Sequence, residues 1–570
     1  MIGSLAPFLI FLVAAAVAAF TWGWLRSAVM LLTPAIGALN LYMMPESATL
    51  NMPFLGYELE LLRVDRLSTL FGYLFHLATF LGVIFALHVK DRVQNVAALL
   101  YAGSALGAVY AGDLITLFLF WEALTLSSLF LILARGTLRA YRASMRYLVI
   151  QVISGLSLLA GILIHVRLTG SIEFSYIGLR PMSDGLPGLA SWLMLLAMAI
   201  KSCFPFLHNW LTDAYPESTP TGTVFLSAFT TKVAVYSLAR AYPGTELLVY
   251  AGATMTMFPI FFAVIENDLR RVLAYSLINQ VGFMVAGIGI GTNLAINGAV
   301  SHAFNDVIFK ALLFMSMGAV LYRTGRINGS DLGGLYKTMP LTTTFCIVGA
   351  ASISAFPLFS GFVSKSMVMA AALEEHYDIV WLALLFASAG VFHHAGIKIP
   401  FFAFFAHDSG LRPKEAPTHM LIAMALAAAI CIFNGSYPWV LYSMLPFPVE
   451  YAPYTETHVL TQVQLLFFSA LAFTWLKVTG LYPPELRGVN IDAEWAYRKA
   501  LPVTARWVTA QAAAMRDAVL GKARRGLYAL VDELSRHGGP EGALARTRPS
   551  GYMALWMTIL LSVFLLLSYI

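Results

Sequence analysis

The sequence predicts an all-α polytopic membrane protein. Hydrophobic residues make up 59% of the 570 residues and charged residues only 12%, against about 25% charged residues in an average soluble domain. The mean hydropathy is +0.75. About sixteen apolar runs are long enough to be transmembrane helices. These observations favour one continuous helical membrane domain over a series of soluble domains.

The apolar runs follow one another along almost the whole chain. They are Ile2–Trp22, Leu25–Met43, Leu67–Leu87, Val93–Ala111, Leu114–Leu133, Tyr147–Val166, Gly188–Leu207, Thr223–Ala239, Leu247–Val264, Val272–Gly291, Leu294–Leu321, Leu341–Leu373, Ile379–Phe405, His419–Phe433, Val459–Leu476 and Gly551–Ile570. Alternate connections, counted from the first, carry fourteen Lys and Arg, and the other set carries five. The positive-inside rule then places the first connection in the cytoplasm and both termini outside.

Composition argues against several classes of function. The net charge of +6 and the pI near 9.0 follow from basic cytoplasmic connections, so they do not indicate nucleic-acid binding. Cys203, Cys346 and Cys431 lie in or beside apolar runs without metal-ligand spacing. No Gly-rich phosphate loop is present in the sequence. We therefore expect no cofactor, no metal site and no nucleic-acid partner.

Two of the runs contain helix breakers at membrane depth. The seventh contains Lys201-Ser202-Cys203-Phe204-Pro205, and the twelfth contains Pro357 and Gly361 ahead of Lys365. Proline removes a helix hydrogen bond, and irregular backbone is tolerated inside a membrane only where it lines a cavity or is buried in protein. Both runs are therefore predicted to be broken helices.

The spacing of lysines indicates an internal repeat. Lys232 follows Lys201 by thirty-one residues, and Lys398 follows Lys365 by thirty-three. Spans four to eight and nine to thirteen are thus predicted to be two five-helix repeats, each with a broken helix, as in many transporters. The predicted divisions are N-terminal helices 1–92, repeats 93–240 and 241–405, further spans 406–482, a cytoplasmic amphipathic extension 483–550 and a terminal span 551–570.

Ionisable residues recur along the run Leu294–Leu321. His302, Asp306 and Lys310 are spaced by four residues, so they share one face of a helix. Each such group costs roughly 2.5–3.5 kcal/mol to insert, and the default interpretation is an ion or proton pathway. The alternative, a helix end whose lysine reaches the interface, fits less well because the apolar residues continue beyond Lys310.

Further ionisable residues lie in other spans. Glu122 is deep in the fifth run and is expected to be the counter-ion of Lys201, either as part of a pathway or as a structural ion pair. A carboxylate that approaches or withdraws can switch a buried lysine between binding and releasing a proton. The candidate proton pathway comprises Glu122, Lys201, Lys232, His302, Asp306, Lys310, Lys365 and Lys398.

Accessory polar residues are predicted beside this pathway. Four in the tenth run are candidates to hold water between the charged groups: Tyr275, Ser276, Asn279 and Gln280. His393 and His394 precede Lys398, and because adjacent residues on a helix point to different sides, we expect at most one of them to line a path.

Several motifs together resemble a known family. They are Lys201 to Ala214, Thr231-Lys232-Val233-Ala234-Val235-Tyr236, Asp268 to Ser276, His302 to Phe314 and Pro357 to Lys365. They are similar to the antiporter-like membrane subunits of respiratory complex I and of Mrp-type multisubunit cation/proton antiporters, most of all the D-type subunits of the Mrp group. The resemblance covers about Asp65 to Phe405.

The resemblance implies a function and partners. It implies a proton-translocating subunit, not an enzyme, in which Glu122, Lys201, Lys232, Lys310 and Lys365 carry protons. The implied partners are other membrane subunits, the lipid bilayer, protons and Na+, in a bacterial cytoplasmic membrane. The chain departs from the family where many members have His, at Asp306 and at Leu226, and at the pair Asn279-Gln280.

Asp306 is therefore expected to hold Lys310 charged, unless it pairs with a neighbouring helix instead. On the first interpretation, Asp306→Asn cripples transport and Asp306→His keeps partial activity.

The extension and the complex leave alternatives open. Apolar residues recur at three- and four-residue steps from Trp507 to Leu534, which predicts an amphipathic helix of about forty residues ending near Gly538. It would lie along partner subunits or on lipid headgroups. The alternative functions are a proton-channel subunit of a redox-driven complex I-like or hydrogenase-like pump, or of an inorganic-carbon uptake complex with a soluble enzyme. A purely structural anchor is disfavoured by the buried lysines.

Overall fold

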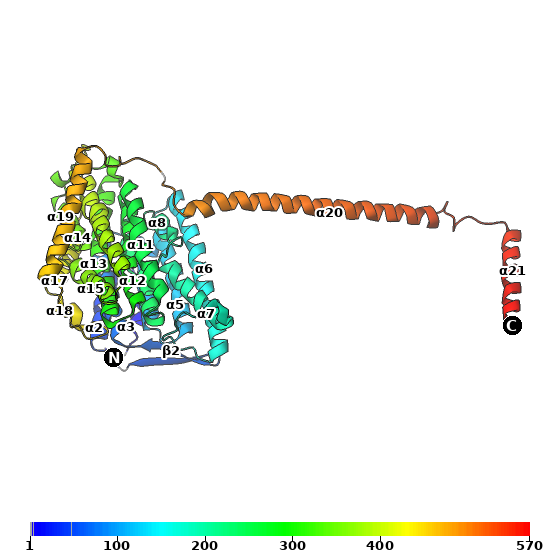
Figure 1. The fold of residues 1–570 in the computed structure, drawn as a ribbon, viewed down its shortest axis with the longest axis horizontal. Helices are drawn as coiled ribbons and strands as arrows, with labels where there is room; N and C mark the ends of the chain where they lie inside the picture. Colours follow the sequence, from blue (N-terminus) through cyan, green and yellow to red (C-terminus); the bar gives the residue numbers. More distant parts are fainter. Residues whose placement is uncertain (1–2, 4, 47, 489, 570) are drawn as a thin grey trace. The chain divides into compact units, whose positions relative to one another are not determined.

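A computed structural model describes residues 3, 5–46, 48–488 and 490–569. The chain divides into two compact units, Met1–Asn490 and Ile491–Ile570 (Figure 1). The first unit contains a bundle of helices and one small sheet, and the second contains two helices.

The first unit is mainly helical. Its α-helices are α1 Pro7–Phe20, α2 Gly23–Tyr42, α3 Arg66–Phe85, α4 Arg92–Tyr110, α5 Leu114–Leu133, α6 Leu138–Thr169, α7 Leu186–Lys201, α8 Asn209–Ala214, α9 Gly222–Ala228, α10 Thr230–Ala241, α11 Glu246–Ile265, α12 Leu269–Ile290, α13 Asn293–Thr324, α14 Pro340–Ile353, α15 Ser360–Glu374, α16 Asp378–Val391, α17 Thr418–Ser436, α18 Trp439–Ser443 and α19 Glu456–Val478. Short 3-10 turns are η1 Met182–Asp184, η2 Gly329–Asp331 and η3 Leu335–Lys337. Two π-helical segments, η4 Phe392–Lys398 and η5 Phe401–Phe405, extend α16.

The described residues contain 13 helices that are long and apolar enough to cross a membrane. Three shorter apolar helices, Pro7–Phe20, Leu186–Lys201 and Pro340–Ile353, complete the set. The protein is thus a multi-pass, mainly helical membrane protein, as the composition predicts. The count of long helices is lower than the predicted sixteen because α1 is short and because the seventh and twelfth runs are divided into shorter helices.

A β-hairpin joins α2 to α3, so the all-α prediction is wrong in this segment. Strand β1 Thr49–Phe54 pairs antiparallel with β2 Tyr57–Arg63 around a two-residue turn at Leu55 and Gly56. Both turn residues have positive φ, 48° and 85°, as a tight hairpin requires. The alternation Glu58-Leu59-Glu60-Leu61 has the period of a strand. Length and composition of the apolar runs alone do not detect it.

Both predicted helix breaks are present. Helix α7 ends at Lys201, and positive φ at Cys203 and Phe206 turns the chain before α8. Helix α14 ends at Ile353, with positive φ at Ala355 and Leu358 before α15. A third break, at Phe229, divides the predicted eighth span into α9 and α10.

Features of the first half recur in the second. Asp113 and Asp268 cap α5 and α12, and isolated bridges pair them with Glu173 and Asn328. Helices α6 and α13 each have 32 residues and end at a left-handed glycine. Lys201 precedes the first pair of positive-φ residues whereas Lys365 follows the second, so the two lysines do not occupy matching positions. The similar spacing of the lysines therefore does not align equivalent positions of the two halves.

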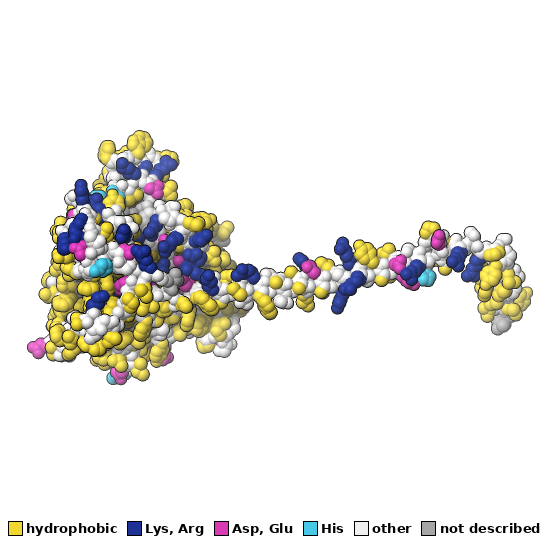
Figure 2. Space-filling model, turned by 90° about the horizontal axis from the view of Figure 1, so that it is seen from above, with side chains coloured by type: hydrophobic (Ala, Val, Ile, Leu, Met, Phe, Trp, Pro, Cys, Tyr) yellow, Lys and Arg dark blue, Asp and Glu magenta, His cyan; other side chains and the backbone are white. Residues whose placement is uncertain are grey.

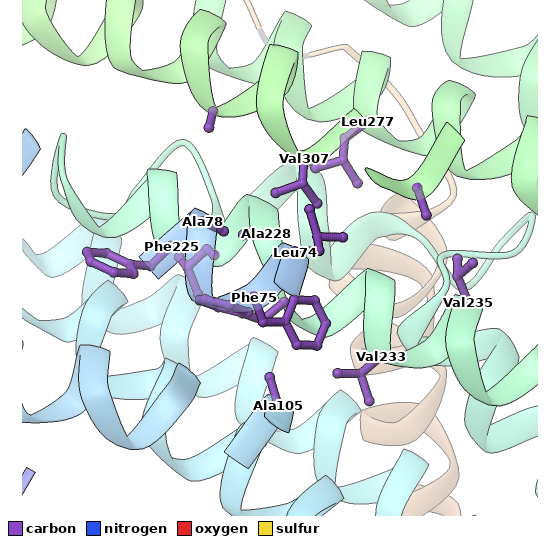
Figure 3. Close-up of a cluster of buried hydrophobic side chains, with 14 of the residues drawn as sticks. Leu74, Phe75, Ala78, Ala105, Phe225, Ala228, Val233, Val235, Leu277 and Val307 are labelled. Atoms are coloured by element: carbon purple, nitrogen blue, oxygen red, sulfur yellow. The ribbon is translucent and has the colours of Figure 1, made fainter. Parts of the chain in front are cut away.

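The centre of the first unit is apolar and shared by several helices. Figure 3 shows Leu74 and Phe75 of α3, Phe225 and Ala228 of α9, and Val307 of α13 around it. Helix α13 is buried along most of its length, from Ala295 to Val320. Its polar residues are therefore removed from both lipid and water.

The second unit contains α20 Leu501–Gly538, preceded by the π-helical turn η6 Ala496–Ala500, and α21 Ser550–Ser568. The predicted long helix of the extension is confirmed, including its end at Gly538. Basic and acidic side chains are spaced along α20 between apolar ones (Figure 2). Helix α21 qualifies by length and composition as a membrane span.

Candidate functional site

Seven of the eight residues predicted to form the proton pathway are buried in the first unit. Lys201, Lys232, His302, Asp306, Lys310, Lys365 and Lys398 are each at most 1% exposed. Glu122 is only partly buried. The buried groups come from α7, α10, α13, α15 and η4, so the two halves of the unit both contribute.

Lys201 binds the helix that carries Glu122, but not Glu122 itself. Its Nζ donates to the backbone oxygen of Trp121, at 2.7 Å, and to Thr125 Oγ1, at 3.0 Å. The ammonium also lies over the Trp121 ring, 4.6 Å from its centroid. Among the described residues no direct ion pair joins Lys201 to Glu122, although the two charges act on one another, so only the direct contact of the predicted pairing is missing.

Glu122 points toward α6 instead. A Cβ built on Gly155 would overlap Glu122 Oε1, so the carboxylate occupies the space that this glycine leaves open. The charge of Glu122 still acts on Lys201 across α5. Gly155 therefore sets the position of the Glu122 carboxylate, and its role could not be predicted from the charged residues alone.

This contact gives a testable expectation. Gly155→Ala should move the Glu122 carboxylate without unfolding the helix pair, because the obstructing atom is the end of a flexible side chain. We expect ion exchange to fall several-fold, roughly in line with the loss of one positioned charge, and the amount of inserted protein to stay unchanged. Gly161→Ala, which would instead meet backbone atoms of α7, is the contrasting variant and should lower the amount of protein.

Asp306 forms an ion pair with Lys232. Lys232 Nζ and Asp306 Oδ2 are 2.5 Å apart, and both side chains are fully buried. This contact joins α10 to α13 and replaces the predicted pairing of Asp306 with Lys310 on the same helix. The alternative of pairing with a neighbouring helix is the one that the structure shows. Lys232 Nζ also donates to Ser227 O, at 3.4 Å, across the break at Phe229.

The other two ionisable residues of α13 contact neutral hydroxyl groups. Lys310 Nζ donates to Ser276 Oγ of α12 at 2.7 Å, so Ser276 is one accessory residue that contacts the line directly. His302 Nδ1 is 3.0 Å from Ser364 Oγ of α15. Lys232, Lys310 and Lys365 are all close enough to act electrostatically on the His302 ring. Helix α13 therefore brings charges from both halves together.

Lys365 uses the second helix break. Its Nζ donates to the backbone oxygen of Ile353, at 2.7 Å, which is the last residue of α14. The ammonium also lies 5.1 Å from the centroid of the Phe283 ring. A broken helix thus provides the carbonyl that holds a buried ammonium, which is the use that such breaks have in ion-transporting proteins.

The remaining accessory residues have different surroundings. Tyr275 stacks on Phe262 at 5.3 Å. Gln280 Nε2 donates to Asn279 Oδ1 at 2.6 Å, and Asn279 Nδ2 donates to the backbone of Thr256. These contacts tie α12 to α11. Ser276, by contrast, contacts a charged group directly, because it accepts the hydrogen bond from Lys310.

Lys398 lies in the π-helical segment η4. Its Nζ donates to the backbone oxygens of Val264 and Glu266, both at 2.6 Å, and pairs with Glu485 Oε1 at 3.0 Å. His394 is fully buried, whereas His393 stacks on Tyr482. The two histidines thus point to different sides, as predicted. Glu485 was missed because it lies after the last span of the first unit, in a segment interpreted as part of the extension.

These side chains are protonatable groups. Among the residues that the structure describes, no cluster of three or more His, Cys, Asp or Glu side chains could hold a metal ion. Lys201, Lys310 and Lys365 have no carboxylate within ion-pair distance among the described residues, and their hydrogen bonds go to neutral oxygens. A lysine held by neutral oxygens can exist as the amine, so it can both accept and release a proton.

Comparison with known proteins places the chain. A family profile described as "NADH:quinone oxidoreductase/Mrp antiporter, TM" matches residues 111–430. The chain is 33% identical over 316 residues to the D subunit of a Na(+)/H(+) antiporter of Alkalihalophilus pseudofirmus, a match that covers 53% of the chain and 64% of the relative. It is also 33% identical to the A/B subunit of a probable K(+)/H(+) antiporter of Rhizobium meliloti, covering 68% of the chain and 41% of the relative. The chain thus spans about half of the length of these curated relatives.

Solved structures share the fold. A structure of the Mrp complex from Dietzia sp. DQ12-45-1b matches with a TM-score of 0.66 at 20% identity, over 82% of this chain and 95% of that one. A structure of the membrane-bound sulfane sulfur reductase, an archaeal respiratory membrane complex, matches with a TM-score of 0.71 at 22% identity, over 98% and 99%. The family predicted from the motifs is confirmed: the chain belongs to the family of transporter-type membrane subunits shared by NADH:quinone oxidoreductases and Mrp antiporters.

Proposed function

We propose that the chain is the proton-translocating subunit of a multisubunit cation/proton antiporter of the Mrp type, with Na+ as the exchanged cation. The observation that carries the proposal is the fully buried pair Lys232–Asp306, together with three further buried lysines whose hydrogen bonds, among the described residues, go to neutral oxygens. A structural anchor gains nothing from such lysines, because each is costly to bury.

Protons move, in this proposal, along Glu122, Lys201, Lys232, Asp306, His302, Lys310, Lys365 and Lys398. Contacts from α10, α12 and α15 converge on the buried face of α13 and bring Lys232, Ser276 and Ser364 to its ionisable residues. Loading of one lysine shifts the affinity of its neighbours for protons by electrostatic repulsion. Such coupling allows the binding of a proton at one end to favour release at the other.

The architecture fits this role. We infer two five-helix repeats, with the matched caps, bridges and 32-residue helices as support. We also infer about sixteen crossings, since short and broken helices can be buried in protein at membrane depth. From the basic connections we infer that both termini lie outside a bacterial cytoplasmic membrane. The second unit, residues 491–570, is proposed to contact other membrane subunits.

A second candidate is a proton-channel subunit of a redox-driven pump or of an inorganic-carbon uptake complex. The family description includes NADH:quinone oxidoreductases as well as antiporters, and this favours the redox alternative specifically.

Purification of the native complex and ion exchange in inverted vesicles separate the candidates. We expect small antiporter subunits to co-purify, and Na+ addition to release protons from energised vesicles. K+ in place of Na+ controls for the identity of the cation. Co-purified quinone-reactive subunits or a soluble metalloenzyme, without Na+-dependent proton release, would support the second candidate instead.

A further inference from the structure

The carboxylate of Glu485, which lies outside the two proposed repeats, contacts the buried ammonium of Lys398. Lys398 is 0% exposed and Glu485 7% exposed, and their charged atoms are 3.0 Å apart. Lys398 Nζ also donates to the backbone oxygens of Ala263, Val264 and Glu266. These residues end α11, where helix carbonyls lack helical partners. The ammonium is thus held by carbonyl oxygens and one carboxylate.

The backbone that carries Glu485 runs along the protein surface. Its neighbours Pro484, Leu486 and Arg487 are exposed. Arg487 pairs with Asp331 at 2.5 Å, and Asn490 Nδ2 donates to Glu266 Oε2 at 3.2 Å. The segment is therefore fixed at the surface by two further contacts, while the Glu485 side chain points inward. The Glu485 carboxylate thus lies between the exposed backbone segment and the buried ammonium of Lys398.

Electrostatics suit Glu485 to proton exchange. Burial raises the pKa of its carboxyl above the ordinary value, and the nearby charges of Lys398 and Lys477 oppose that rise. Glu266 raises the pKa of Glu485 further, and its own charge is offset by Arg271, 3.9 Å away. A carboxyl with a raised pKa takes up a proton closer to neutral pH than an ordinary glutamate does.

We propose that Glu485 is the group through which Lys398 exchanges protons with water. An N–H bond of the Lys398 ammonium breaks and an O–H bond forms on Glu485, which leaves a neutral amine and a neutral carboxylic acid. The acid then gives the proton to water and returns to the carboxylate. The reverse sequence loads Lys398. The inference rests on the proposed function for Lys398, and Glu485 lies outside the residues that match the family, 111–430.

Glu485→Gln, Glu485→Asp and Arg487→Gln in the intact complex test the proposal. Glu485→Gln keeps the shape and should lower proton flux about a hundredfold, the low end for a positioned proton-transfer group. Glu485→Asp should keep most of the flux with a shifted pH profile. Arg487→Gln removes an anchor of the same segment and should leave both unchanged. Full flux with the wild-type pH profile in Glu485→Gln would overturn the proposal, as would equal losses in Glu485→Gln and Arg487→Gln.

A readout independent of transport separates this inference from the proposed function. A carbodiimide modifies protonated carboxyl groups in apolar sites, and mass spectrometry measures modification of Glu485 across pH. In Lys398→Gln the carboxyl loses its cation, so its modification should extend to higher pH than in the wild type. An unchanged profile would overturn the pairing. If the wild-type complex moves no protons, the proposed function fails, while the labelling still decides whether Glu485 titrates against Lys398.

Discussion

Asp306→Asn is expected to abolish ion exchange and to destabilise the protein. Lys232 and Asp306 are 2.5 Å apart with no exposed surface on either side chain. Removal of one partner leaves a buried charge without compensation, which typically costs about 3–5 kcal/mol of unfolding free energy. We expect exchange to fall at least about a hundredfold, as for loss of a positioned proton-transfer group. Exchange in inverted vesicles and thermal unfolding of the purified complex measure the two effects.

A double variant separates the charge from the contact. Lys232→Met with Asp306→Leu replaces the pair by apolar side chains of similar size, which is often close to neutral for stability. We expect the double variant to unfold near the wild-type temperature and still to exchange no ions. If Asp306→Asn alone matches the wild type in both measurements, the pair has no role in either.

The pairing also changes the expectation for Asp306→His. On the sequence alone, His at this position restores a common family pattern and should keep partial activity. The partner of Asp306 is Lys232 on another helix, and this buried ammonium needs a negative charge opposite it. An imidazole is neutral or positively charged, so it cannot supply that negative charge. Asp306→His should therefore fail as Asp306→Asn does, and exchange measured across pH in both variants tests this.

The helices and their breaks could be predicted from the sequence because both depend on local chemistry. Inside a membrane the backbone N–H and C=O groups of an apolar run must be hydrogen-bonded within the protein. A helix satisfies them within a single segment. Pro205 and Pro357 lie within two breaks, in line with the helix hydrogen bond that proline lacks. The hairpin was missed because it lies between two spans, where the hydrophobicity of a segment does not determine its secondary structure.

The partners of the charged residues could not be predicted in the same way. Spacing along one helix gives the face that a residue shares, but not the helix that faces it. Asp306 shares a face with Lys310, yet Lys232 reaches it from α10. Glu122 of α5 and Lys201 of α7 belong to one half, yet the carboxylate fills the space that Gly155 leaves open on α6. Glu485 lies far from Lys398 in sequence, and only the path of the chain after α19 brings them together.

Lys201→Met is expected to abolish exchange as fully as Asp306→Asn, but without loss of stability. The hydrogen bonds of Lys201 go to a backbone oxygen and a hydroxyl, so its removal leaves no paired carboxylate behind. Thr125 Oγ1 already donates to Trp121 O at 3.2 Å, and this bond remains in the variant. Removal of a buried charge also removes its desolvation cost. The unfolding temperature of the complex should therefore equal or exceed that of the wild type.

Lys201→Arg distinguishes proton release from mere positive charge. Arginine keeps the charge at all accessible pH values and does not release its proton in proteins. If Lys201 takes part by giving up a proton, the arginine variant should lack exchange although its charge is intact. Exchange rates and membrane levels of Lys201→Met and Lys201→Arg are measured together with the wild type. Near-normal exchange in Lys201→Arg would show that this position supplies only a fixed charge, and the proton route would then have to bypass it.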